Sequence, residues 1–189
     1  MATRLAAKRT AAPATKKATA PAKPAAFKVD HDNYTDGYLR GILRRVKTIA
    51  MVGASTNWNR PSFFAMKYLQ HKGYRVIPVN PGAAGQMLLG EKVYASLKEI
   101  PDKVDMVDIF RNSAAAGPIA EDAIAIGAPV VWMQLGVRND EAAARAEAAG
   151  LDVVMNRCPK IEYARLHGEL SWGGINSGII SSKRMKPRE

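Results

Sequence analysis

The stretch Thr48-Ile49-Ala50-Met51-Val52-Gly53-Ala54-Ser55 decides the fold that this sequence predicts. Its first five residues are mostly apolar, as in a strand buried on both faces of a sheet, and a glycine turn follows them. A helical pattern then covers residues 61–71, where Pro61 suits the first turn and Gly73 the end of the helix. A buried strand, a glycine turn and a helix in this order indicate the first half of a βαβ unit.

The same alternation continues along the chain. We expect further strands at 74–80, 104–110, 129–133 and 151–155, helices at 35–46, 118–126 and 140–149, a helical turn at 96–100 and a loop over 81–95. Pro78 lies inside the second strand, which favours an edge position for that strand or a place for the proline at the end of the strand. Five strands alternating with helices predict an α/β fold, a Rossmann-like doubly wound parallel sheet in a single domain.

The charge of the chain belongs mainly to its ends. Lys and Arg number 28 and Asp and Glu 17, a net charge of +11. Residues 1–26 hold six basic residues and no acid, and residues 181–189 hold four basic residues and one acid, which leaves 18 basic and 16 acidic residues between them. A nearly neutral body argues against a globular nucleic-acid binder, which would carry its own basic patch.

The two ends are therefore expected to be tails. Residues 1–29 are rich in Ala, Lys and Pro, and we expect disorder because they bury too little apolar surface to offset the entropy of ordering. We favour a solubilising role; a weak polyanion contact and an organellar transit peptide are the alternatives. The folded domain is expected over 30–170, followed by a Gly-rich and basic tail over 171–189.

Cysteine and histidine usage excludes several kinds of site. Cys158 is the one cysteine, so the chain forms no intrachain disulfide and no multi-cysteine zinc site, which fits a reducing compartment such as the cytoplasm. The three histidines, at 31, 71 and 167, are too scattered to suggest a metal cluster. No apolar run approaches the ~18 residues that span a bilayer, and no secretory signal is apparent.

The residues that follow each strand are the candidates for chemistry, because ligands of open α/β sheets bind beyond the carboxyl ends of the strands. The first turn leads into a helix whose free backbone N–H groups favour an anion by ~0.3–1 kcal/mol. Ser55 and Ser62 add hydroxyl groups there, and Arg60 adds a guanidinium suited to phosphate. An ordinary glycine turn with a capping serine is the alternative.

Two common nucleotide motifs are absent. A dinucleotide fingerprint, G-x-G-x-x-G, would need glycine at Ser55 and Trp58, and no acid to bind a ribose lies between Ser55 and Glu91. A nicotinamide dinucleotide is therefore disfavoured. Gly90 is followed by Glu91 where a P-loop needs Lys, so ATP hydrolysis is not indicated.

Six short segments carry a family resemblance: 49–55, 60–62, 76–81, 107–111, 131–137 and 156–160. In order and in placement at strand ends they resemble the small single-domain coenzyme A-binding proteins, which are similar to the N-terminal CoA-binding domain of the succinyl-CoA synthetase alpha subunit. The resemblance covers about residues 35–166. It implies a Rossmann-type domain that binds CoA without a known reaction.

The resemblance also implies roles for individual residues. The pyrophosphate would lie on the first turn, at Gly53, Ala54, Ser55, Arg60, Pro61 and Ser62, and the nucleotide would lie at the end of the second strand, at Asn80 and Pro81. The adenosine or the pantetheine would lie beside the end of the third strand, at Phe110 and Arg111. The pantetheine arm would run along the end of the fourth strand, at Trp132, Met133 and Gln134. The synthetase has a lysine after its second strand that this chain lacks, so Arg60 and Arg111 are candidates for the 3′-phosphate.

The predicted function is non-catalytic binding of CoA or an acyl-CoA, as a sensor or carrier. An enzyme acting on a CoA thioester through Cys158 or Asp108, an NAD(P)-binding regulator and a nucleic-acid-associated protein acting through its tails are the alternatives. For Cys158 we expect a packed, inert thiol; a mixed disulfide with CoA is a further hypothesis. Asp108 is expected to be solvated or paired with a helix, and Lys160 and Glu162 to form a surface pair. Trp132 is assigned equally to the core and to a ligand wall.

Overall fold

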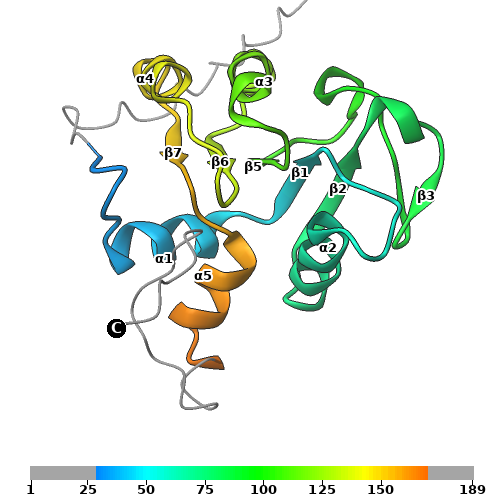
Figure 1. The fold of residues 1–189 in the computed structure, drawn as a ribbon, viewed down its shortest axis with the longest axis horizontal. Helices are drawn as coiled ribbons and strands as arrows, with labels where there is room; N and C mark the ends of the chain where they lie inside the picture. The colour runs from blue at the N-terminus through cyan, green and yellow to red at the C-terminus, as the bar shows by residue number, and fades with distance from the viewer. Residues whose placement is uncertain (1–28, 170–189) are drawn as a thin grey trace, which may run out of the picture.

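The computed structural model describes residues 29–169, which fold around one five-stranded parallel sheet (Figure 1). Across the sheet the strands follow the order β2-β1-β5-β6-β7. Their bounds are β1 (Thr48–Val52), β2 (Arg75–Val79), β5 (Met106–Ile109), β6 (Val130–Met133) and β7 (Asp152–Val154). The predicted fold class and the edge position of the strand that contains Pro78 are both confirmed.

Five helices cover the two faces of the sheet. They are α1 (Asp36–Arg45), α2 (Pro61–His71), α3 (Ser113–Ala125), α4 (Asp140–Ala148) and α5 (Pro159–Leu166). Figure 1 shows α3 and α4 on one side of the sheet and α1, α2 and α5 on the other. Side chains alternate along β1, so Ile49 and Met51 pack with the α1 and α2 side while Ala50 packs with the α3 and α4 side.

Side-chain caps set where several helices begin. Thr35 accepts a hydrogen bond from the Tyr38 backbone N–H, and Asn112 accepts one from the N–H of Ala115. Because Asn112 caps α3, this helix begins at Ser113 and Pro118 lies inside it. The prediction that Pro118 begins the helix is wrong, since the φ of proline is compatible with a helix that has already started, at the loss of one backbone hydrogen bond.

The segment 81–95, expected to be a loop, contains regular structure. It holds a 3₁₀ turn, η1 (Pro81–Ala83), and the antiparallel pair β3 (Met87–Leu88) and β4 (Glu91–Lys92). The two residues between these strands, Leu89 and Gly90, have φ angles of 48° and 85°, a feature of tight hairpin turns. The sequence hides this hairpin because leucine rarely adopts a positive φ. The expected turn near 96–100 is η2 (Leu97–Glu99).

The remaining differences concern the C-terminal part. The helix α5 was not among the expected helices, and the expected strands are one to two residues longer at their ends than the strands formed. The predicted tails at 1–29 and 171–189 lie almost wholly outside the described residues and stay predictions. Within residues 29–169, no helix combines the length and the apolar character that crossing a bilayer requires.

Gly53 forms the turn that joins β1 to the loop before α2. Its backbone N–H donates to the carbonyl of Val79 at 2.9 Å, and its φ is +90°. A Cβ atom at this position would lie 2.9 Å from the Phe110 carbonyl oxygen and 3.0 Å from Cδ of Arg111. The ends of β1, β2 and β5 therefore meet at a point that only glycine fits.

We expect Gly53→Ala to lower the free energy of unfolding by about 2–3 kcal/mol, because the substitution adds a backbone clash to the cost of a positive φ. Gly73→Ala is the matched control: its φ is +88°, but a Cβ there meets nothing within 4 Å. Urea denaturation of both variants measures the difference. Equal stability of the two variants would show that the close approach to β5 costs nothing.

Candidate ligand-binding site

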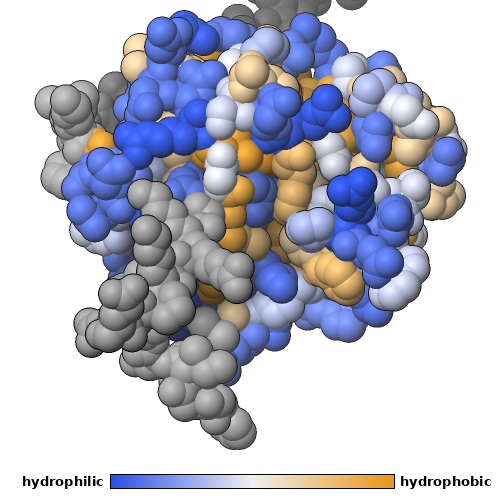
Figure 2. Space-filling view, viewed as in Figure 1, coloured by the Kyte–Doolittle hydropathy of each residue, from blue (hydrophilic) through white to orange (hydrophobic). Residues whose placement is uncertain are grey.

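A mostly apolar cavity of about 500 Å³ opens at the carboxyl ends of the central strands. Four parts of the chain line it, namely α2, the segment after β5, the segment after β6 and the start of α5: Pro61, Phe64 and Ala65; Phe110 and Arg111; Gln134, Leu135 and Val137; Cys158, Lys160 and Ile161. Figure 2 shows hydrophobic residues gathered in the middle of this face. The location is the one expected for the ligand crevice of an open α/β sheet.

Hydrogen bonds fix the turn beside the cavity. The Ser62 Oγ accepts from the backbone N–H of Ser55 at 3.1 Å, and the Asn80 side chain donates to the Ala54 carbonyl at 2.7 Å. The side-chain oxygen Oδ1 of Asn80 accepts a hydrogen bond from the backbone N–H of Gly82 at 3.0 Å. Ser62 and Asn80 therefore hold the turn. In the first turn of α2, Pro61 has no N–H and the Phe63 N–H donates to the Arg60 carbonyl at 3.0 Å, so the N–H of Ser62 is the one that stays available to an anion.

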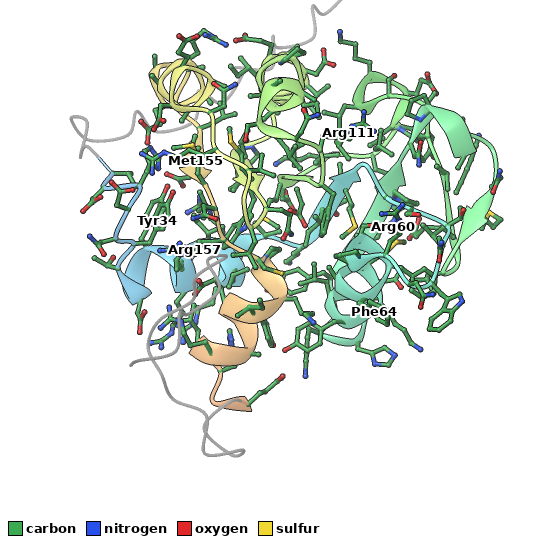
Figure 3. The ribbon with its side chains drawn as sticks, viewed as in Figure 1. Tyr34, Arg60, Phe64, Arg111, Met155 and Arg157 are labelled. Atoms are coloured by element: carbon green, nitrogen blue, oxygen red, sulfur yellow. The ribbon has the colours of Figure 1, made fainter. Side chains whose placement is uncertain are left out.

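Three cations surround this region. Arg111 and Lys160 line the cavity, and Arg60 stands at the N-cap of α2 without a side-chain capping bond (Figure 3). In the described part of the chain none of the three has a carboxylate within ion-pair distance. Their positive charges are therefore available to an anionic ligand.

Asp108 lies fully buried beneath the cavity. Its two carboxyl oxygens accept from Nε2 of Gln134 at 2.9 and 3.1 Å. Burial raises the pKa of Asp108 to about 8, against the opposing effect of the Gln134 hydrogen bond, so the group is mostly protonated at neutral pH. The expectation of a solvated or helix-paired carboxylate is wrong, because the neutral acid is packed between neighbouring strands.

Cys158 also faces the cavity, at the N-cap of α5. The thiol is buried, and that burial raises its pKa despite the backbone N–H groups of α5 beside it. In the described residues no base forms a hydrogen bond with it; His167 instead stacks on Tyr163 at 3.9 Å between ring centres. The thiol is thus held in its protonated form, which is the weaker nucleophile.

The structure brings only some of the predicted site residues to the cavity. Pro61, Phe110, Arg111 and Gln134 line it, whereas Trp132 and Met133 are fully buried in the core. Trp132 donates its ring N–H to the Arg157 carbonyl at 2.8 Å, which fixes it away from the cavity. The other predicted residues are not lining residues. Ser62 lies in the first turn of α2, and the rest lie between β1 and α2 or directly after β2: Gly53, Ala54, Ser55 and Arg60; Asn80 and Pro81.

Several lining residues were not among the predicted site residues. Phe64 points from α2, and Lys160 and Ile161 come from α5. The proposed surface pair of Lys160 and Glu162 is wrong, because Glu162 is 1% exposed and pairs with Arg165 at 2.9 Å. Pro159 at the first position of α5 is the signal that could have indicated this helix.

Comparisons with known proteins agree with this geometry. A family described as a CoA binding domain matches residues 47–164. The Bacillus subtilis (strain 168) protein YneT is 39% identical over 132 residues, which cover 70% of this chain and 96% of that protein. The solved structure of a hypothetical protein from Pyrococcus horikoshii OT3 is 45% identical with a TM-score of 0.68, covering 72% of this chain and 95% of that one.

A partial match extends to an enzyme. The acetate–CoA ligase [ADP-forming] II of Archaeoglobus fulgidus is 38% identical over 65 residues, which cover 33% of this chain and 9% of the ligase. The shared part is a small fraction of that enzyme, so its activity does not transfer with the match.

We expect Asp108→Asn to stabilise the fold increasingly as the pH rises from about 5 to 8. The folded protein keeps the Asp108 proton up to a pKa of about 8, whereas the unfolded chain loses it near 3.8. The parent protein therefore loses stability over this interval, by at most about 1.4 kcal/mol per pH unit, and the asparagine variant does not. Glu141→Gln, which removes an exposed carboxylate of α4, is the matched control for the loss of one acid. Urea denaturation at four pH values measures the free energy of unfolding of each protein. If this free energy changes with pH in the same way in the parent and in Asp108→Asn, Asp108 is not a buried neutral acid.

Proposed function

The chain belongs to the CoA-binding domain family, and from that premise we propose that it binds CoA or an acyl-CoA without catalysing a reaction, as a sensor or carrier. The observation that carries this proposal is the combination of a mostly apolar cavity with three unpaired cations among the described residues: Arg60, Arg111 and Lys160. Such a site suits a long, amphipathic ligand that is anionic at one end.

The parts of CoA have complementary partners in this site. The pyrophosphate suits the N-terminus of α2 with Arg60 beside it, because the backbone N–H of Ser62 and a guanidinium can both donate to phosphate oxygens. Arg111 is the second candidate for the 3′-phosphate. The pantetheine arm suits the apolar cavity between Phe64, Phe110 and Ile161. Trp132 and Met133 would support this wall from beneath.

An NAD(P)-binding regulator is supported less well. Asn80 follows β2, where nicotinamide-dinucleotide proteins place the acid that binds the ribose. Its side chain already bonds to Ala54 and Gly82. An acid in this place would repel the 3′-phosphate of CoA, so its absence favours CoA over NAD.

An enzyme acting on a CoA thioester is the alternative of a different class. It would use Cys158 as nucleophile or Asp108 as base. Burial raises the pKa of both groups, which keeps the thiol and the acid protonated and makes each a poor starting state for attack or proton abstraction. These protonation states favour binding over catalysis.

Two finer predictions rest on the sequence alone. The single cysteine fits a cytoplasmic location. The six basic residues of the segment 1–26 fit a weak contact with a polyanion, which added salt would weaken.

Calorimetric titration with CoA, acetyl-CoA, NAD and NADP tests the proposal. We expect clear preference for the CoA species, and we expect Arg60→Ala to weaken CoA binding about 10-fold or more, as the loss of a charge-assisted hydrogen bond does. Arg44→Ala, an equal change of charge at an exposed position of α1, should leave the affinity within about twofold. Acetyl-CoA should be recovered intact.

Equal or tighter binding of NAD would overturn the ligand assignment. Release of free CoA thiol from acetyl-CoA at a rate that depends on Cys158 would favour the enzyme instead.

A further inference from the structure

Two exposed aromatic side chains lie on either side of Arg60 in the sequence. Trp58 is 65% exposed and Phe64 is 48% exposed, and Met87 on β3 is the third large apolar side chain that is exposed among the described residues. Arg60 stands at the N-cap of α2, and Phe64 lies one helical turn further along, with its N–H directed at the Arg60 carbonyl at 3.5 Å (Figure 3). Two exposed rings therefore flank one of the unpaired cations described above.

The backbone that carries Trp58 is a hydrogen-bonded turn. The Arg60 N–H donates to the carbonyl of Asn57 at 3.1 Å, so Trp58 and Asn59 are the two central residues of a four-residue turn. Side chains hold the turn as well, because Oδ1 of Asn57 accepts from the N–H of Asn59 at 2.9 Å and Oγ of Ser55 accepts from the N–H of Asn57 at 3.2 Å. The main chain at Trp58 is thus already ordered, and it loses little further entropy when a ligand binds there.

The indole of Trp58 makes neither an aromatic contact nor a hydrogen bond with any other described residue. The indole of Trp132, by contrast, is buried and donates its ring N–H to the Arg157 carbonyl. Trp58 also stands where a dinucleotide fingerprint has its last glycine, the residue that lets helix and strand pack closely. Here the position carries a large, flat and exposed side chain two residues before a guanidinium that is open to phosphate. These are the two groups that bind a base and its phosphates in many nucleotide sites.

The order of these side chains matches the order of the parts of CoA. In CoA the pyrophosphate joins the adenosine to the pantetheine arm. Arg60 likewise lies between Trp58 and Phe64, and Phe64 lines the cavity proposed for the pantetheine arm. A ligand with its pantetheine in the cavity and its pyrophosphate at Arg60 has its adenosine outside the cavity. Trp58 does not line the cavity, and its α-carbon is two peptide units, at most about 7.6 Å, from that of Arg60.

We propose that the indole of Trp58 stacks on the adenine of the bound ligand, and that this contact selects pantetheine joined to a nucleotide over pantetheine alone. The inference rests on the proposed function. Stacking removes one face of the indole and one face of the base from water, while Arg60 binds the phosphates next to them. Such a contact recognises the flat surface of the base and needs no hydrogen bond to it.

Calorimetric titration with three ligands tests the stacking contact: CoA, adenosine 3′,5′-bisphosphate, which lacks the pantetheine arm, and 4′-phosphopantetheine, which lacks the adenosine. We expect Trp58→Leu to weaken the binding of CoA and of the bisphosphate about 10-fold, as the loss of a stacked base does, and to change phosphopantetheine binding less than about twofold. Trp58→Phe is the matched variant at the same position. It keeps a ring that can stack, so it should bind CoA more tightly than Trp58→Leu does.

Fluorescence supplies a second measurement, which a merely structural role of Trp58 would not change. An adenine stacked on an indole quenches its emission, so CoA should quench the emission of the parent protein. The quenching should be largely lost in Trp58→Phe, although this variant still binds CoA. Thermal unfolding of each variant checks that it is folded. Where a half-ligand binds too weakly to measure, the CoA affinities of the two variants and the quenching decide.

The outcomes separate the two proposals. If the parent binds CoA and Trp58→Leu binds it as tightly, or if the quenching persists in Trp58→Phe, the stacking contact is overturned while the proposed function stands. An equal loss of affinity for all three ligands would overturn it too, because that pattern indicates a general disturbance of the turn. If the parent binds neither CoA nor either half of it, the proposed function fails and this inference fails with it.

Discussion

The close approach of the turn at Gly53 to the end of β5 is the constraint on which the site depends. The Gly53 N–H donates to the carbonyl of Val79 at the end of β2, and the Phe110 carbonyl occupies the space that a Cβ atom at Gly53 would need. This contact brings three strand ends together and sets where the chain leaves for α2. The N-terminus of α2 and the segment after β5 consequently lie at the same cavity, and they bring Arg60 and Arg111 to it from two sides.

The cavity wall combines two kinds of residue for physical reasons. The apolar part comes from helix side chains such as Phe64 and Ile161, whose helices α2 and α5 lie on the same side of the sheet. The polar part comes from strand ends, where backbone and side-chain groups are held by neighbouring strands. Gln134 has its side-chain amide bonded to Asp108 and its main chain bonded to Ile109 and Val137, so its side chain is held in the cavity wall and loses little further entropy when a ligand binds.

Local charge matters more here than the charge of the whole body. Residues 27–180 are nearly neutral, yet the cations beside the cavity lack carboxylate partners among the described residues, whereas cations elsewhere, such as Arg75 and Arg138, are paired with acids. The net charge calculated from the sequence does not distinguish the unpaired cations at the cavity from the paired cations elsewhere. A bound anion interacts mainly with the charges near the cavity, because salt screens charges that are more than about 10 Å away.

The fold class could be predicted from the sequence alone, since buried strands, glycine turns and amphipathic helices are local patterns. So could the placement of Gly53 and Arg111 after strands and of Arg60 at the start of the first crossover helix, where ligands bind. Only the tertiary structure decided that Trp132 packs into the core and that α5 closes the cavity. It also decided that Asp108 is buried beneath Gln134. The physical reason is that burial and the direction of a side chain at a strand end depend on which neighbouring strands and helices pack there, and those neighbours are distant in sequence.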